Sequence, residues 1–259
     1  MLKELYTAAL GMLPQQTRLE VIANNMANAN TVGFKRQSVF ERNMIDARAN
    51  FYNVQGQAEQ DDPPVGSYID FESGSFQKTD NPLDVSIENQ KGFFLVQDED
   101  GNQFLTKAGH FTLSTDGTII TTDGKKLMGS SGEINVNPKL LDSAQSLDDT
   151  ASKVRITDEG EVFLNDTPVG TITVLSVDDL SSIEQISNAT FIARQDTDAT
   201  VMDPSEVKIK QGWVENSNVD IIREMVSMIE LQRAYEAGSK VIHTNDATLD
   251  NSMRLGRYY

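Results

Sequence analysis

Apolar residues recur with a helical period at both ends of the chain. Near the N-terminus they follow steps of three and four through Leu2, Leu5, Ala9, Met12, Gln16, Leu19, Ala23 and Met26, where only Gln16 is polar. Near the C-terminus the same steps join Ile221, Met225, Met228, Gln232, Tyr235, Ser239, Ile242, Asp246, Leu249 and Met253. Alternating steps of three and four define the a and d positions of a heptad, so each end predicts a helix with an apolar seam.

The two seams predict that the terminal helices pair with each other. Neither helix buries its own seam, and the chain between them is mostly unsuited to helix. The second seam would run for roughly 50 Å at about 1.5 Å per residue. Its polar positions, with Gln16 of the first seam, would set the register at some cost in stability. The alternative is a pair of ordinary core helices in a globular domain.

Local signals predict where the helices begin and end. The first helix should fade from Asn24 to Asn30, because asparagine competes for backbone hydrogen bonds, and Gly33 can then supply a positive φ. Pro14 lies inside the first seam and removes a backbone donor, which predicts a kink in preference to a later helix start. Ser217 or Asn218 is the expected N-cap of the last helix.

Short apolar runs between the helices predict β-strands. They are Val85–Ile87, Phe93–Val96, Phe104–Leu105, Phe111–Leu113, Ile119–Ile120, Lys126–Met128, Glu161–Leu164, Gly170–Leu175 and Val207–Lys210. Asp-Gly pairs, which suit tight hairpins, follow Glu99, Thr115 and Thr122. We therefore expect an α+β fold in which paired N- and C-terminal helices, coiled-coil-like, accompany a mainly antiparallel β central domain.

The predicted division of the chain follows from these patterns. Residues 1–36 and 214–259 form the paired terminal helices, and residues 76–213 form the β-rich domain. Residues 37–75 connect them, because from residue 48 to 74 the chain is rich in Asn, Gln, Asp and Gly and buries little apolar surface.

Composition and motifs argue against nucleic-acid binding, metal binding and catalysis. A net charge of −17 repels nucleic acid, and the absence of cysteine removes thiolate nucleophiles and cysteine-rich zinc sites. The Asp98–Asn102 run lacks the EF-hand glycine and glutamate spacing, and the only histidines, His110 and His243, lie far apart. No apolar run is long enough for a membrane span, and the N-terminus predicts no cleaved signal peptide. We expect no enzyme, cofactor or metal site.

Specific segments resemble the bacterial flagellar rod and hook axial protein family. The most specific is residues 23–36, Ala-Asn-Asn-Met-Ala-Asn-Ala-Asn-Thr-Val-Gly-Phe-Lys-Arg, and residues 74–76, 81–87, 92–96 and 106–111 extend the likeness. Residues 215–220, 224–226 and 232–236 are similar to the family's C-terminal signature. Asn-Pro-Leu-Asp followed by Gly-Phe-Phe looks most like proximal rod subunits, with the distal rod subunit close behind and hook protein disfavoured.

The resemblance implies a structural subunit whose terminal helices form the inner layer of a tube, with the β domain outside. The implied subunit interface comprises Leu5, Met12, Leu19, Asn24, Asn25, Met26, Asn28, Thr31, Gly33, Phe34, Lys35, Ser217, Asn218, Val219, Met225, Met228, Gln232, Arg233, Tyr235, Ile242 and Leu249. Phe34 would anchor the turn after the first helix, while Lys35 and Arg36 would meet acidic surfaces of the next subunit.

The implied partners are copies of the chain, other rod proteins, hook and basal-body neighbours and the flagellar type III export apparatus. The implied location is the periplasmic part of the flagellar basal body, reached without a cleaved signal peptide. Two rival classes remain. A monomeric export adaptor or chaperone could bind clients through exposed helices. An enzyme would need a polar constellation in a cleft, which no motif proposes.

Overall fold

The computed structural model describes residues 2–41, 65–136, 151, 153–194 and 199–256. The described chain divides into two compact units. The helical unit takes the described parts of Met1–Ala27, Gln37–Tyr68 and Asp220–Tyr259, and the β unit takes those of Asn28–Arg36 and Ile69–Val219. The chain therefore passes from the helical unit into the β unit and back twice.

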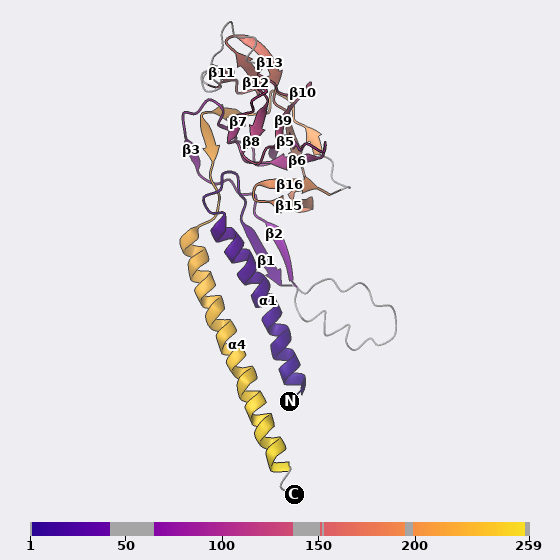
Figure 1. Ribbon diagram of the computed structural model, residues 1–259, viewed down its shortest axis with the longest axis vertical. Helices are drawn as coiled ribbons and strands as arrows, with labels where there is room; N and C mark the ends of the chain where they lie inside the picture. Colours follow the sequence, from indigo (N-terminus) through magenta and orange to yellow (C-terminus); the bar gives the residue numbers. More distant parts are fainter. Residues whose placement is uncertain (1, 42–64, 137–150, 152, 195–198, 257–259) are drawn as a thin grey trace, which may run out of the picture. The chain divides into compact units, whose positions relative to one another are not determined.

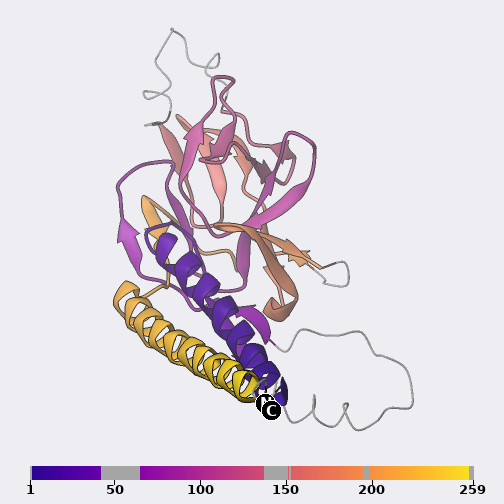
Figure 2. The same ribbon diagram turned by 60° about the horizontal axis from the view of Figure 1, so that its bottom comes forward.

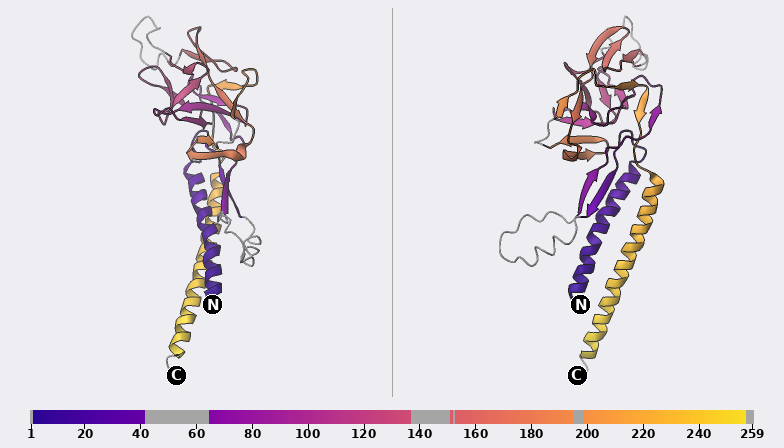
Figure 3. Two further views of the ribbon diagram at one scale, coloured as in Figure 1. Left: turned by 90° about the vertical axis from the view of Figure 1, so that its right-hand side faces the viewer. Right: turned by 180° about the vertical axis from the view of Figure 1, so that it is seen from behind.

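The helical unit contains both terminal helices. Helix α1 spans Leu2–Ala27 with Pro14 inside it, and α4 spans Ile221–Gly256. The two helices contact each other and run in opposite directions, as Figures 1, 2 and 3 show. Helix α1 therefore does not begin after Pro14. A kink at Pro14 and coiled-coil pairing of the two helices both stay predictions.

A two-stranded ribbon completes the helical unit. It consists of β1 (Gln37–Glu41) and β2 (Val65–Ile69), and β1 contacts α1. The ring of Phe40 lies over Gly66, where an added Cβ would come within 2.3 Å of the ring. Because β1 and β2 pair, the predicted connecting segment 37–75 is not simply a linker.

The β unit is built from short strands. They are β3 Phe76–Lys78, β4 Val85–Ile87, β5 Gly92–Gln97, β6 Gln103–Thr106, β7 Phe111–Leu113, β8 Ile119–Thr121, β9 Lys126–Gly129, β10 Gly132–Glu133, β11 Val154–Ile156, β12 Glu161–Leu164, β13 Thr167–Thr171, β14 Val174–Val177, β15 Ile183–Ser187, β16 Thr190–Ala193, β17 Ala199–Val201, β18 Ile209–Gln211 and β19 Trp213–Glu215. A 3-10 turn, η2, covers Leu180–Ser182.

One ten-stranded sheet dominates the β unit, in the order β15-β16-β6-β5-β9-β8-β7. Strand β10 adds to β9, β14 adds to β5, and β17 adds to β14. A three-stranded sheet, β11-β12-β13, and two pairs, β18-β4 and β19-β3, accompany it. The pairings within this unit are antiparallel, so the predicted antiparallel β domain is confirmed.

The sequence signals for hairpins are confirmed in detail. Gly101, Gly117 and Gly124 have φ values of 86°, 82° and 82°, and they join β5 to β6, β7 to β8 and β8 to β9. A glycine adopts this left-handed conformation without the Cβ clash that other residues meet. The predicted run Gly170–Leu175 is instead divided between the end of β13 and the start of β14.

Two apolar clusters form the core of the β unit. The larger one gathers Val85, Phe94, Phe111 and Ile209 with other aliphatic side chains, and the rings of Phe94 and Phe111 meet edge to face at 5.4 Å. In the smaller one, Phe71, Phe93 and Phe191 pack against one another with centroids 5.6 to 5.9 Å apart. Phe71 belongs to the predicted connecting segment, so that segment is held by the core.

The structure corrects two predicted boundaries. Residues 28–36 were placed with the helices, but they group with the β unit, where Phe34 is 0% exposed. The N-cap of α4 is neither Ser217 nor Asn218. Asp220 directly precedes the helix, and its Oδ1 accepts hydrogen bonds from the backbone N–H groups of Ile222 and Arg223. An aspartate there also matches the positive end of the helix dipole.

Neither α1 nor α4 is apolar enough over its described residues to cross a membrane.

Candidate functional site

Residues that follow α1 enter the β unit through a turn that only glycine fits. Gly33 has a φ of 72°, and its N–H donates to the backbone oxygen of Glu215 at 2.8 Å. A Cβ on Gly33 would lie 2.3 Å from the backbone nitrogen of Ala108. The predicted positive φ is therefore confirmed, and the close approach to residue 108 adds a second reason for glycine.

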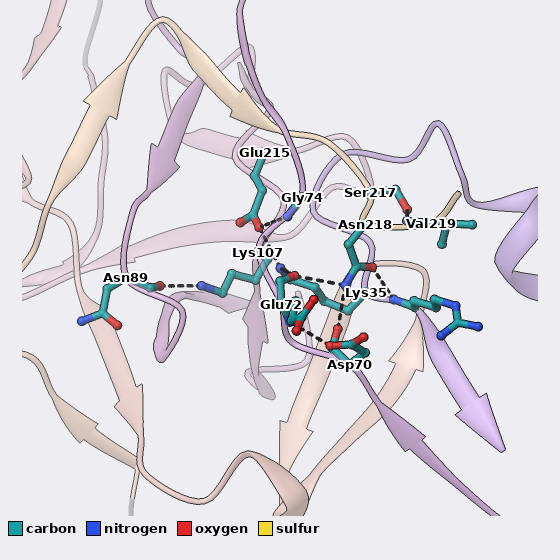
Figure 4. A network of polar contacts seen from close by, with 11 residues as sticks. Lys35, Asp70, Glu72, Gly74, Asn89, Lys107, Glu215, Ser217, Asn218 and Val219 are labelled. Carbon is teal, nitrogen blue, oxygen red and sulfur yellow. Dashed lines mark hydrogen bonds and ion pairs between the residues drawn. The ribbon is translucent and has the colours of Figure 1, made fainter. Parts of the chain in front are cut away.

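A buried ion pair lies two residues further on. Lys35 and Glu215 are 1% and 3% exposed, and Lys35 Nζ donates to Glu215 Oε1 at 2.7 Å. Lys35 Nζ also donates to the backbone oxygen of Glu72 at 2.9 Å, and the N–H of Gly74 donates to Glu215 Oε1 at 3.0 Å. Figure 4 shows these groups converging from three separate stretches of chain. Both charges are thus paired and hydrogen-bonded, as burial requires.

Asn218 extends the contact. Its Oδ1 accepts from the N–H of Arg36 at 2.7 Å, and its Nδ2 donates to the backbone oxygens of Asp70 and Glu72. The N–H of Asp70 donates to the backbone oxygen of Arg36 at 2.8 Å. The side chain of Asn218 therefore makes hydrogen bonds to backbone groups of two other segments of the chain, one at Arg36 and one at Asp70 and Glu72. We call the whole set the polar clasp: Gly33, Lys35, Arg36, Asp70, Glu72, Gly74, Glu215 and Asn218.

Lys107 is a second buried lysine next to the polar clasp. It is 3% exposed, its Nζ donates to the backbone oxygen of Asn89 at 2.7 Å, and it lies 5.0 Å from the centroid of the Phe93 ring. The pKa of Lys107 is lowered to about 7, mainly by burial, with Glu215 acting in the opposite direction and Lys35 adding to the lowering. An ammonium loses hydration when buried, so the neutral amine is favoured.

The asparagine-rich segment has internal roles in the structure. Asn25 is 1% exposed, its Nδ2 donates to the backbone oxygen of Gln37, and its Oδ1 accepts from the N–H of the same residue. Asn28 accepts the hydroxyl of Thr31 through Oδ1 and the N–H of Thr31 through its backbone oxygen. The expectation that asparagines turn the chain after the first helix is confirmed.

The predicted interface residues are distributed unevenly. Lys35 was expected to meet a neighbouring subunit, but it is buried against Glu215 of its own chain, which corrects that role. Phe34 is buried, as predicted for an anchor. The side chains of Leu5, Met12 and Leu249 lie outside the described residues. Half-buried positions are Leu19, Met26, Thr31, Ser217, Asn218, Val219, Met228 and Ile242, and exposed positions are Asn24, Met225, Gln232, Arg233 and Tyr235.

Sequence reasoning missed an apolar stripe on α4. Ile222, Met225, Val226 and Ile229 are 75%, 47%, 51% and 50% exposed, and their steps of three and four place them on one helix face. The recurrence is visible in the sequence, but the heptad seam was assigned to one face only. Met225 belongs to both the predicted seam and the stripe, and the seam residues Gln232 and Tyr235 are exposed as well.

A pocket of about 220 Å³ with a mixed polar and apolar lining opens in the β unit. Threonine is the commonest residue in its walls, which also include the apolar Val32, Val96, Ala108 and Ala189 and the polar His110, Asp123, Lys125 and Asn188. Nδ1 of His110 lies 2.6 Å from Oδ1 of the buried Asp84. In the part of the chain that the structure describes, no group of three or more histidines and acids is placed to hold a metal ion.

Comparisons with known proteins agree with the resemblance. Residues 5–35 match the family model for flagella basal body rod protein, and residues 87–164 match that for the flagellar hook protein FlgE/F/G D1 domain. Residues 210–255 match the model for the flagellar basal body rod FlgEFG protein C-terminal region. Lys35, Lys107 and Glu215 fall in three different matched regions, so the buried charges join all three.

Whole-chain relatives give the same answer. The flagellar basal-body rod protein FlgG of Agrobacterium fabrum is 32% identical over 95% of this chain and 96% of its own length. FlgG of Bacillus subtilis is 30% identical over 99% and 100%, and the rod protein FlgF of Caulobacter vibrioides is 30% identical over 98% of each chain. The chain belongs to the flagellar basal-body rod protein family, part of the bacterial flagellum. The predicted family is thereby confirmed.

Proposed function

We propose that the chain is a structural subunit of the flagellar rod that assembles helically through its terminal helices and transmits torque from motor to hook. The exposed apolar stripe of α4 carries the proposal. Exposure of four large apolar side chains on one helix face to water raises the free energy, and a neighbouring copy that covers them removes this cost. The identity of the chain's relatives supports the same role.

An open helical assembly follows from the kind of interface proposed. A stripe on one copy that meets a different surface on the next copy forms a heterologous contact. When the rotation between copies does not close a ring, subunits add without limit along a helix. Coiled-coil pairing of α1 with α4 would stiffen each copy. The exposed seam residues Met225, Gln232 and Tyr235, with the neighbouring Arg233, would then face other copies.

The polar clasp supplies a mechanical part of this proposal. Gly33 lies six residues after the end of α1, and Asn218 lies three residues before the start of α4. The clasp ties both stretches to the same place in the β unit through buried hydrogen bonds. A load that enters through either helix would reach a backbone anchored by an ion pair, which resists displacement more than an exposed loop does.

The proposed partners are further copies of this chain, other rod proteins and hook or basal-body neighbours, with the flagellar type III apparatus as exporter. The proposed site is the periplasmic part of the rod. Relatives named FlgG and FlgF both match nearly the whole chain, so their names do not separate a proximal from a distal position. Counting copies per particle separates them: a low count indicates the proximal segment and a high count the distal one.

Val226→Glu is expected to abolish incorporation into basal bodies while the isolated chain still folds. The change places a charge in the centre of the stripe, where a covered carboxylate would have no partner. Val201→Glu, on β17 of the β unit, is the matched control, because that valine is 69% exposed and lies off α4. Incorporation is measured by quantitative mass spectrometry of purified basal bodies, and folding by circular dichroism.

Normal incorporation of Val226→Glu would remove the stripe from the interface. Absence of the wild-type chain from basal bodies would overturn the structural role itself. A stable monomer that binds one defined partner at every concentration would then favour the export adaptor, which could use the same stripe to hold a client.

A further inference from the structure

The charges that act on the buried Lys107 are one of each sign. The charged groups that act on it are Glu215 and Lys35. Glu215 is already committed, because its Oε1 accepts from Lys35 Nζ at 2.7 Å and from the N–H of Gly74. Among the described residues no carboxylate lies within ion-pair distance of Lys107 Nζ, which has the backbone oxygen of Asn89 and the face of Phe93 as partners.

We propose that Lys107 makes the polar clasp sensitive to pH. When its buried amine takes up a proton, two ammonium groups compete for the single carboxylate of Glu215. The second charge weakens the hold of Glu215 on Lys35 and on the N–H of Gly74, since both depend on that carboxylate. When the amine is neutral, the Lys35–Glu215 pair is balanced and the clasp closes fully. The clasp is therefore tighter in mild alkali than in mild acid.

The direction of the stability change follows from the two states of Lys107. In the folded chain its pKa is about 7, whereas an unfolded lysine keeps its proton up to its ordinary pKa of 10.5. Between these values the unfolded chain holds more protons, so the folded chain gains stability as pH rises. One extra proton in the unfolded state lowers the unfolding equilibrium constant about tenfold for each pH unit in this window.

Heteronuclear NMR of lysine side chains in the full-length chain tests the charge state directly. We expect one lysine Cε signal to titrate near pH 7, and we expect Lys107→Met to remove that signal. If every lysine signal titrates above pH 10, the inference is overturned. This measurement uses the wild-type fold, so it does not depend on the variant being stable. It is also made on free chains, so it stands apart from assembly and from the proposed rod function.

Denaturant unfolding tests the coupling to the fold. Trp213 is the only tryptophan and lies two residues from Glu215, so its fluorescence reports this unit. Between pH 7 and 9 the folding equilibrium constant of the wild type should rise about tenfold per pH unit relative to that of Lys107→Met. Lys91→Met is the matched control, because Lys91 is 50% exposed, and it should follow the wild type.

Amide hydrogen exchange tests the clasp itself. After correction for the intrinsic effect of pH, the protection of the Gly74 N–H should fall from pH 9 to pH 6 in the wild type and stay level in Lys107→Met. Equal pH dependence of protection in the two proteins would show that Lys107 does not control the clasp.

Discussion

Glu215→Gln is expected to destabilise the β unit by about 3–5 kcal/mol, the range for breaking one partner of a buried ion pair. The glutamine keeps the shape of the side chain and can still accept from the N–H of Gly74, so packing changes little. The substitution removes the carboxylate that compensates the charge of Lys35, a side chain that is 1% exposed. The same carboxylate also acts on Lys107. Urea unfolding followed through Trp213 measures the loss.

The control is Glu184→Gln. Glu184 also forms an ion pair, with Arg194, but the two side chains are 54% and 63% exposed. Exposed pairs contribute about 0–1 kcal/mol because water and salt screen them. A loss at Glu215 no larger than at Glu184 would mean that the clasp does not stabilise the fold. The double variant with Lys35→Met should recover part of the loss, because it removes one of the uncompensated charges.

Gly33→Ala is the second change expected to have a large effect. Its φ of 72° strains any residue with a Cβ, at about 1–2 kcal/mol. The new methyl group would also lie 2.3 Å from the nitrogen of Ala108, which is backbone and cannot turn aside. Overpacking of this kind adds about 1–3 kcal/mol, and the N–H to Glu215 hydrogen bond would be displaced with it.

Gly124→Ala separates the two causes. Gly124 has a φ of 82°, yet a Cβ there would meet nothing within 4 Å. It should show the conformational strain alone, so Gly33→Ala should be the more destabilising variant by at least about 1 kcal/mol. Equal losses of unfolding free energy for the two variants would show that the close contact with Ala108 adds no destabilisation.

The elements of the fold could be predicted because their signals are local. Heptad steps placed α1 and α4, and short apolar runs placed β4 to β9. Strands β15 and β16 carried no such signal, since Ile183 to Ala193 mixes polar and apolar residues without strict alternation. The connecting segment was misjudged for a related reason: its composition suggested a linker, yet Phe71 belongs to the core and β1 pairs with β2.

The candidate site was predicted only in part. Asn25, Asn28, Gly33, Phe34, Lys35 and Asn218 were all singled out from the sequence. Their partners were not, because Lys35 and Glu215 are separated by 180 residues and nothing local links them. A lysine in an acidic chain indicates a surface charge by composition, so Lys35 was assigned to a neighbouring subunit. Only the packed β unit shows that it is buried.

The sequence by itself determined the two terminal helices, the antiparallel strands with their Asp-Gly turns and the positive φ at Gly33. These depend on dihedral preferences and periodicities that neighbouring residues set. The tertiary structure alone decided that Lys35 pairs with Glu215, that Gly33 touches Ala108, and that the stripe from Ile222 to Ile229 stays open. Burial and ion pairing depend on chain segments that meet only after folding, so no local pattern encodes them.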